Sequence, residues 1–320
     1  MTSRERVLKA LNFEELDRVP FNFWMDRRLM AEYEREYGEG WRVKVFDADV
    51  VETFLSLAFP SSPMVEESGT MWITDPMLKS LDDIDSLVMP DPTDDVVLSL
   101  VEVDIEAYPD RAIFVDTPGV LGIVHSMREY QNILMDVYDS PDQLKKLFDR
   151  ISDVVAEAVT RVCELDITAI YVMDDLSCRQ GLFMSLPMLE EFIFPYNRKM
   201  IDAAKKAGVP VLMHCCGKST DAIDSFVEQG VYALNPLQPH LHDLKAFKAK
   251  YHGKLAAYGA LDNTYIIPDG TPDEVRAHVR ETFETLGRGG GLIFSTHDIP
   301  IYTPRENIEA MLDEIKRCVY

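Results

Sequence analysis

The stretch VPVLMHCCG, residues 209–217, opens with a β-branched apolar run and ends in side chains that can bind a metal. Five other segments share this asymmetry: AIFVDTPG (112–119), TAIYVMDD (168–175), YALNPLQP (232–239), LAAYGALD (255–262) and GLIFSTHD (291–298). Strands that begin apolar and end polar are typical of parallel sheets, in which the strand C-termini meet the ligand. The chain from residue 112 onward therefore predicts six strand–helix units.

Helix start and stop signals separate these segments. Ser140-Pro141 starts one predicted helix, and capping boxes that contain a proline start two others at Thr271 and Thr303. Glycines stand where three helices should end: Gly230, Gly253 and Gly287. The second half of the chain thus alternates strands and helices.

The first third of the chain is less regular. A short capped helix at Thr2 precedes a predicted strand over Arg18–Trp24, and residues 43–54 are expected to hold a second strand. Residues 61–109 are predicted to be loop-like, with a small hairpin at MWITDP (71–76). Right-handed βαβ crossovers leave a closed barrel or an open doubly wound sheet, and eight units favour the barrel. We predict one TIM-type (β/α)8 domain over residues 1–320, with an N-terminal helical and hairpin elaboration.

Charge and composition exclude several classes of partner. The 320 residues carry a net charge of −23, which disfavours nucleic acid and anionic membranes because both require clustered Lys and Arg. No apolar window approaches the ~18 residues of a membrane span, and the N-terminus lacks a secretory apolar region. The five cysteines are irregularly spaced, as reduced thiols are. We expect a cytoplasmic protein.

The strongest local signal is His214-Cys215-Cys216. Side chains alternate along a strand, so His214 and Cys216 should share a face while Cys215 points away. An imidazole and a thiolate side by side form half of a zinc site; a histidine packed near buried thiols is the other interpretation. His297 ends the last predicted strand, where it is placed to be a third ligand or to bind a substrate anion without metal.

Polar residues at other strand ends are candidates for the substrate site. Asp174 or Asp175 is predicted to act as a general acid, a further ligand or a partner of a histidine, although a loop or helix-start role is equally compatible. Wall positions come from two strand ends: Asn235 and Gln238 lie at one, and Asp262 lies at the other. After the first predicted strand, Trp24 precedes Arg27 and Arg28, a pair that is suited to a substrate carboxylate or to a solvated helix start.

Over nearly its whole length the chain resembles the uroporphyrinogen decarboxylase superfamily. The resemblance rests on ordered blocks: DRVPFNFWM, REYQNILMDVYDSPDQL, GLFMSLPMLEEFIFPY, VPVLMHCCGK, GVYALNPLQP, YGALDN and STHDIPIYTPRENIEAM. The superfamily fold is a TIM barrel, which agrees with the unit count. Its members include decarboxylases of uroporphyrinogen and corrinoid-linked methyltransferases.

Two features of the resemblance favour the methyltransferase branch. The decarboxylases have W-F-M-R-Q-A-G-R, whose arginines hold carboxylates, whereas this chain has Asp26 at the first arginine position. The methyltransferases share the H-x-C motif seen here at His214 and Cys216. Thiol-directed methyltransferases also carry a distant cysteine, and His297 occupies that position in this chain, which resembles the decarboxylases there. Two nitrogens and one sulfur make zinc a stronger Lewis acid, which suits activation of a neutral methyl donor.

The resemblance thus implies a zinc methyltransferase of an O-demethylase system. Its metal ligands would be His214, Cys216 and His297, and its acceptor a corrinoid (cobalamin) carried by a partner protein. Its donor would be a small methoxylated molecule. The alternatives are a methylcobamide:thiol methyltransferase, a metal-free decarboxylase that uses Arg27, Arg28 and an aspartate, and a barrel that only binds a corrinoid or metal.

Overall fold

The computed structural model describes residues 1–67 and 70–320, with side chains described outside residues 66–71. Its main sheet has seven parallel strands in the order β1-β4-β5-β8-β9-β10-β11. Their bounds are β1 Val50–Phe54, β4 Ala112–Pro118, β5 Ala169–Met173, β8 Val211–His214, β9 Ala233–Leu237, β10 Ala256–Ala260 and β11 Leu292–Ser295. Two antiparallel hairpins lie outside it: β2 Met64–Glu67 with β3 Thr70–Ile73, and β6 Ser177–Cys178 with β7 Gly181–Leu182.

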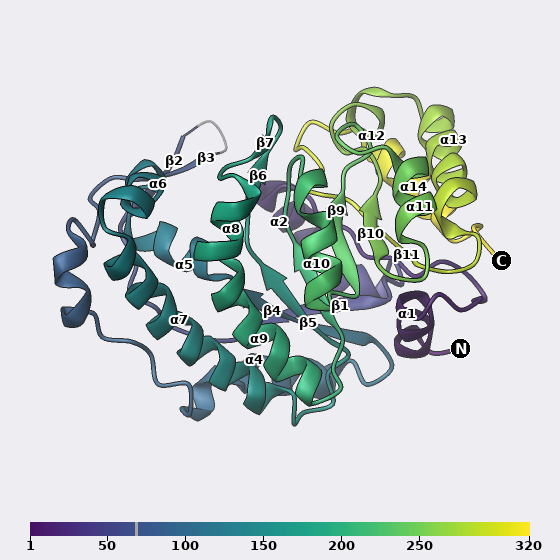
Figure 1. The fold of residues 1–320 in the computed structure, drawn as a ribbon. Helices are drawn as coiled ribbons and strands as arrows, with labels where there is room; N and C mark the ends of the chain where they lie inside the picture. Colours follow the sequence, from purple (N-terminus) through teal and green to yellow (C-terminus); the bar gives the residue numbers. More distant parts are fainter. Residues whose placement is uncertain (68–69) are drawn as a thin grey trace.

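Helices surround the strands, which lie in the middle of the molecule (Figure 1). The α-helices are α1 Ser3–Leu11, α2 Arg27–Tyr37, α3 Trp41–Lys44, α4 Ser99–Ala107, α5 Val120–Met127, α6 Tyr130–Asp139, α7 Pro141–Val162, α8 Leu186–Phe192, α9 Phe194–Lys206, α10 Ile223–Gln229, α11 Leu244–Tyr251, α12 Ile266–Asp269, α13 Pro272–Thr282 and α14 Arg305–Ile315. Short 3-10 turns are η1 Leu81–Ser86, η2 Asp95–Val97 and η3 Thr220–Ala222, and η4 Phe283–Gly287 is a π-helical turn. The six strand–helix units expected after residue 112 are all present, and the fold is a TIM-type barrel.

The position of the eighth strand is filled by an extended segment that is paired only at isolated points. Phe21 forms a parallel bridge with Phe294 of β11, and Met25 forms another with Ile299. On the opposite side, the backbone nitrogen of Asp49 donates to the carbonyl oxygen of Phe21 at 2.9 Å. The strand expected over residues 18–24 is therefore reduced to bridges. Pro20 has no N–H to donate to a ladder, which is one physical reason.

Asp49 ties this segment to the N-terminal helix and to β1. Its fully buried carboxylate accepts hydrogen bonds from Ser3 Oγ at 2.8 Å and from the backbone nitrogen of Phe21 at 3.0 Å. The guanidinium groups of Arg6 and Arg18 each lie 2.5 Å from it. Two cations and two neutral donors thus satisfy one buried carboxylate where the barrel closes.

Alternation along the strands separates two cores. Side chains such as Ile113 and Val115 pack between strands and helices, while their neighbours Ala112 and Phe114 point into the barrel. The interior set comprises Val50, Ala112, Phe114, Ala169, Tyr171, Leu212, Ala233, Ala256, Tyr258 and Ile293. The next positions in the same phase, toward the strand C-termini, are those that face the mouth of the barrel.

Helix α1 closes the base of the barrel. Its apolar face packs against the interior set through three residues: Val7, Ala10 and Leu11. The backbone nitrogen of Gly291, just before β11, donates to the carbonyl oxygen of Ala10 at 3.0 Å. Since α1 contacts the beginnings of the strands, the opposite end is the one left for a ligand.

Two local expectations were wrong. Residues 61–109 are not only loop, because α4 forms within them and buries Val101 completely. Thr303 does not cap α14: the helix begins at Arg305, and the Thr303 hydroxyl is buried without a hydrogen-bond partner among the described residues. The backbone of Thr303 instead closes a turn onto Pro300, which directs the hydroxyl inward.

Other local expectations are confirmed. Thr2 and Thr271 form capping boxes with Glu5 and Glu274, and α7 begins at Pro141. The hairpin expected near residues 71–76 is β2–β3, and the strand expected within residues 43–54 is β1. Among the described helices, none has the length and apolar character needed to cross a membrane.

Candidate metal and substrate site

Three side chains converge at the C-terminal ends of β8 and β11. His214, Cys216 and His297 each offer a ligand atom, and these atoms all lie within 4.8 Å of one another. The rings of His214 and His297 are 6.0 Å apart between centroids. Alternation explains the pairing, because His214 and Cys216 are two residues apart while Cys215 is fully buried in the outer core.

The turn after β8 holds Cys216 in place. Gly217 has φ +92, and a Cβ there would meet the backbone of Cys178 at 2.7 Å. The backbone nitrogen of Gly217 donates to Oε1 of Gln238 at 2.9 Å. Gln238, expected at the substrate wall, therefore supports this turn. It is not among the residues that line the cavity bordered by His214 and His297.

Hydrogen bonds fix which nitrogen of His214 is available. Its Nδ1 lies 3.0 Å from Oδ1 of Asn235 and 3.0 Å from the hydroxyl of Tyr171, which also donates to Asn235. Since an amide oxygen only accepts, Nδ1 carries the proton in the neutral form of the ring, and Nε2 then has the free lone pair that a metal needs. Histidines that bind metals are oriented in this way by a partner on the other nitrogen.

Asp175 lies beside the cluster. Its Oδ1 is 3.4 Å from Nε2 of His214 and accepts a hydrogen bond from the backbone nitrogen of Cys216 at 3.1 Å. Burial opposes the charged form of His214, but this carboxylate outweighs burial and raises the pKa of His214. Burial and then Asp175 raise the pKa of the Cys216 thiol, so a cation is needed to stabilise its thiolate.

His297 has the opposite electrostatic setting. Burial, followed by the charge of His214, lowers the pKa of His297. A neutral imidazole is the form that binds a metal. His297 therefore stands ready as a nitrogen ligand without losing a proton first.

A cavity of about 290 Å³ opens beside the cluster and is bordered by His214 and His297. Its aromatic walls are Trp24, Phe54 and Tyr171, and its acids are Glu52, Asp116 and Asp298. Within the described part of the chain, no lysine or arginine lines it. The cavity thus suits a small neutral or cationic molecule better than one rich in carboxylates.

Two acids of this cavity, Glu52 and Asp116, were not found from the sequence. They project inward from the neighbouring strands β1 and β4, in the phase of Val50 and Phe114. Each interrupts an apolar run. Because side chains alternate along a strand, the residue two positions after an inward-facing residue also faces inward, and this signal identifies both acids.

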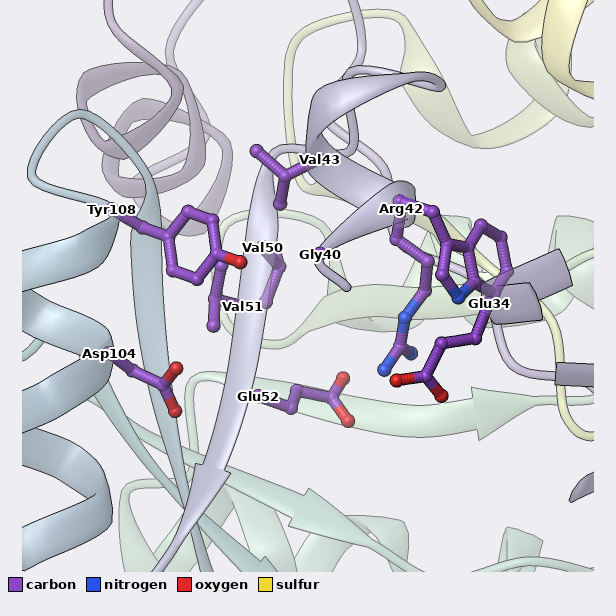
Figure 2. Close-up of a pocket in the computed structure, with 10 residues that line it drawn as sticks. Glu34, Gly40, Arg42, Val43, Val50, Val51, Glu52, Asp104 and Tyr108 are labelled. Atoms are coloured by element: carbon purple, nitrogen blue, oxygen red, sulfur yellow. The ribbon is translucent and has the colours of Figure 1, made fainter. Parts of the chain in front are cut away.

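Glu52 also borders a second cavity, of about 210 Å³, outside the sheet next to the edge of β1 (Figure 2). Figure 2 shows the guanidinium of Arg42 and the carboxylates of Glu34 and Glu52 on one side of this cavity, with Asp104 and Tyr108 on the other. Because the extended segment around Phe21 does not pair regularly with β1, this edge of the strand is open to the cavity.

Asp174 was expected as a catalytic candidate, but the structure turns it away from the cavity. Its carboxylate accepts hydrogen bonds from the backbone nitrogen of Gly122 at 3.0 Å and from Nδ2 of Asn197 at 2.8 Å, at the start of α5. Gly119 makes room for it, because a Cβ there would meet the Asp174 side chain at 2.3 Å. Burial raises the pKa of Asp174 to about 6. The contacts indicate a structural role.

Replacing Asp174 with alanine should destabilise the fold without removing metal. The change leaves the backbone N–H of Gly122 and the Asn197 amide buried without a hydrogen-bond partner, which should lower the free energy of unfolding by about 2–4 kcal/mol. Asp175→Ala is the matched control: that side chain is 56% exposed, so stability should hold while metal affinity falls roughly 10–100-fold. Thermal unfolding and metal titration of both variants measure the difference. Loss of metal in Asp174→Ala with normal stability would contradict the assignment.

The remaining expected residues are divided between two places. Trp24 and Asn235 border the cavity, whereas Arg27 and Arg28 lie exposed in the first turn of α2, where Arg28 pairs with Asp26 at 2.9 Å. Neither arginine is therefore among the described residues that line the cavity, where it was expected to bind a substrate carboxylate.

Asp262 lies outside the cavity as well. It accepts hydrogen bonds from the backbone nitrogens of Thr264 at 2.8 Å and Tyr265 at 3.0 Å, and it borders a separate cavity with His240 and His278. Its role at the end of β10 is to shape the following loop.

Comparison with known proteins gives the family. The sequence model of uroporphyrinogen decarboxylase (URO-D) matches residues 61–318. Methylcobamide:CoM methyltransferase MtbA of Methanosarcina mazei is 20% identical over 100% of this chain and 99% of its own length. A uroporphyrinogen decarboxylase of Crocosphaera subtropica is 21% identical over 97% of this chain and 95% of its own. A solved methyltransferase from Methanosarcina mazei has a TM-score of 0.77 at 17% identity, covering 99% of both chains.

Fold and cluster together define a TIM-barrel protein with a candidate metal centre at the C-terminal ends of its strands. The chain belongs to the uroporphyrinogen decarboxylase family.

Proposed function

We propose that this protein is a zinc-dependent methyltransferase that moves a methyl group from a methyl ether, or a similar methoxylated donor, to the cob(I)amide of a separate corrinoid protein. The observation that carries the proposal is the cluster of His214, Cys216 and His297 beside a small cavity. Two relatives named methylcobamide:CoM methyltransferases support a corrinoid partner.

The cluster fits zinc by its donor set and its spacing. Zn–N bonds of about 2.0–2.1 Å and Zn–S bonds of about 2.3 Å place tetrahedral ligands about 3.5 Å apart. Ligand atoms within 4.8 Å of one another reach that spacing through small side-chain rotations. Three protein ligands leave the fourth position for a substrate, which is typical of catalytic zinc.

Each residue of the site has a part in the proposed reaction. Zinc would supply a Lewis acid that polarises the oxygen of the methyl donor. Asn235 and Tyr171 orient the ring of His214, while Trp24 and Phe54 give the donor an apolar wall and exclude water. Asp175 is placed to set the charge at the cluster.

The cavity argues against the alternative of uroporphyrinogen decarboxylation. Pockets for drug-sized ligands begin at about 300 Å³, and this one measures about 290 Å³, too little for a tetrapyrrole. Its charged walls are acidic, so a substrate with a carboxylate on every ring would be repelled. A thiol acceptor remains the second candidate, because two relatives are named methylcobamide:CoM methyltransferases.

Metal content and methyl transfer test the proposal together. The purified chain should hold about one zinc, and it should form methylcobalamin from cob(I)alamin and a methoxylated benzene. Methylation of a thiol by methylcobalamin with no ether cleavage would favour the second candidate. Release of carbon dioxide from uroporphyrinogen by metal-free protein would overturn both.

His297→Ala should lose most of the zinc. Removal of an outer-sphere partner of a metal ligand already lowers affinity roughly 10–100-fold, and removal of a ligand should cost more. Elemental analysis after dialysis measures this loss, with His252→Ala, a histidine on the far side of the barrel beside Phe13, as the control. Equal zinc in wild type and His297→Ala would remove His297 from the metal centre.

A further inference from the structure

The acids Glu52 and Asp116 lie on the neighbouring strands β1 and β4 and line the cavity that His214 and His297 also border. Asp116 is 7% exposed, and its Oδ1 has no hydrogen-bond partner among the described residues. Glu52, in contrast, accepts hydrogen bonds from Nδ2 of Asn22 at 2.8 Å and from the hydroxyl of Tyr258. Oε1 of Glu52 thus accepts two hydrogen bonds, whereas Oδ1 of Asp116 accepts none from the described residues.

The surroundings of the two acids favour a neutral Asp116 beside a charged Glu52. Burial raises the pKa of both groups, and the charge of Glu52 raises the pKa of Asp116 further. The charged and titratable groups that face Asp116 are Glu52 on β1, Tyr171 on β5, Tyr258 on β10 and Arg42 on α3. Arg42 acts in the opposite direction and favours one negative charge in the pair. The donors around Glu52 stabilise that charge, so Asp116 is the neutral acid.

We propose that Asp116 is the general acid that protonates the departing oxygen of the methyl donor, with Glu52 as its charged neighbour on β1. This inference rests on the proposed function. It assigns the acid role to neither aspartate at the end of β5, because Asp174 is bound to α5 and Asp175 lies against His214 and Cys216.

The proposed step conserves atoms and electrons. The bond between the methyl carbon and the donor oxygen breaks, and its electron pair stays on the oxygen. The carbon forms its new bond with the electron pair of the reduced corrinoid acceptor. The oxygen takes the proton of Asp116 and leaves as an alcohol or phenol. Asp116 regains a proton from water, for which Glu52 offers a route because it borders both cavities.

Leaving-group dependence tests the assignment. With methyl phenyl ether, whose departing anion is strongly basic, Asp116→Asn should lower methyl transfer about 10²–10⁴-fold. With methyl para-nitrophenyl ether, whose anion leaves unaided, the same variant should lose less than roughly 10-fold. Asp298→Asn makes the same chemical change at an exposed acid of the cavity, and it should affect both donors by equal factors. Equal losses for both donors in Asp116→Asn would overturn the proposal.

Glu52→Gln tests whether the charge of Glu52 acts on Asp116, because this substitution removes the charge and keeps the size of the side chain. Removal of its charge lowers the pKa of Asp116, so activity with methyl phenyl ether should be lost at a lower pH than in wild type. An unshifted pH profile would exclude Glu52 from this role.

Infrared spectroscopy distinguishes failure of this inference from failure of the proposed function. At neutral pH, wild type and Asp298→Asn should show the carbonyl stretch of a buried protonated carboxylic acid, and Asp116→Asn should lack it. If this band is present but wild type cleaves no ether, the proposed function fails and the acid role falls with it. If ethers are cleaved and the band is absent, only the role of Asp116 is overturned.

Discussion

Cys216→Ala should abolish both zinc binding and methyl transfer. Cys216 supplies the only sulfur of the described cluster, and a ligand set of two imidazoles holds zinc far more weakly than one completed by a thiolate. In the proposed reaction, the charge that develops on the donor oxygen would lose its main stabilisation without the metal. We expect a fall in rate of more than about 10³-fold.

Cys215→Ala is the matched control for this prediction. Cys215 is the adjacent thiol, but it is fully buried in the outer core, with its sulfur 3.5 Å from Oγ of Ser177. Its replacement should leave zinc and methyl transfer intact and reduce only thermal stability. Elemental analysis and the cob(I)alamin assay on both variants compare them directly. Zinc retained in Cys216→Ala and lost in Cys215→Ala would reverse the assignment.

Asp49→Asn should strongly destabilise the point at which the barrel closes. The change removes the negative charge that Arg6 and Arg18 share, and it leaves two guanidinium groups facing an amide in a buried site. Breaking a buried ion pair from one side costs about 3–5 kcal/mol. For a chain of this size, Tm should fall by roughly 5–15 °C.

Asp47→Asn provides the comparison for Asp49. Asp47 also contacts Arg18, at 3.4 Å, and Arg111, at 2.7 Å, but its side chain is 55% exposed. Solvent screens such pairs, so the loss should stay under about 1 kcal/mol. Asparagine also tolerates the φ of 60 at this position. Equal destabilisation of the two variants would mean that Asp49 does not hold the closure of the barrel.

The repeating half of the fold was accessible from the sequence because each strand and helix carries its own local signals. Proline and capping residues mark the start of α7 and α13, and apolar runs mark the six strands β4, β5, β8, β9, β10 and β11. In the first third of the chain, the local signals do not predict the structure that forms. The residues of α4 alternate apolar and acidic side chains as a strand does, and only burial of Val101 in the folded chain selects the helix. Pairing around Phe21 depends on partners more than 250 residues away.

The same contrast applies to the site. His214 and Cys216 stand out because alternation within one strand brings them together, and His297 because it ends the last strand. Asp174 and Asp175 look equivalent in sequence, and the contacts with α5 and with His214 decide between them. Glu52 lies in a strand whose register was not fixed before the structure.

Because α1 covers the base of the barrel, it affects the order in which the two substrates can bind. In the proposed reaction, a partner as large as a corrinoid protein would approach from the open rim of the barrel, by the same route as the methyl donor. Once the corrinoid protein is bound at the rim, a methyl donor could not enter the cavity. Turnover should therefore follow a compulsory order, with the small molecule loaded first and the corrinoid protein docking last.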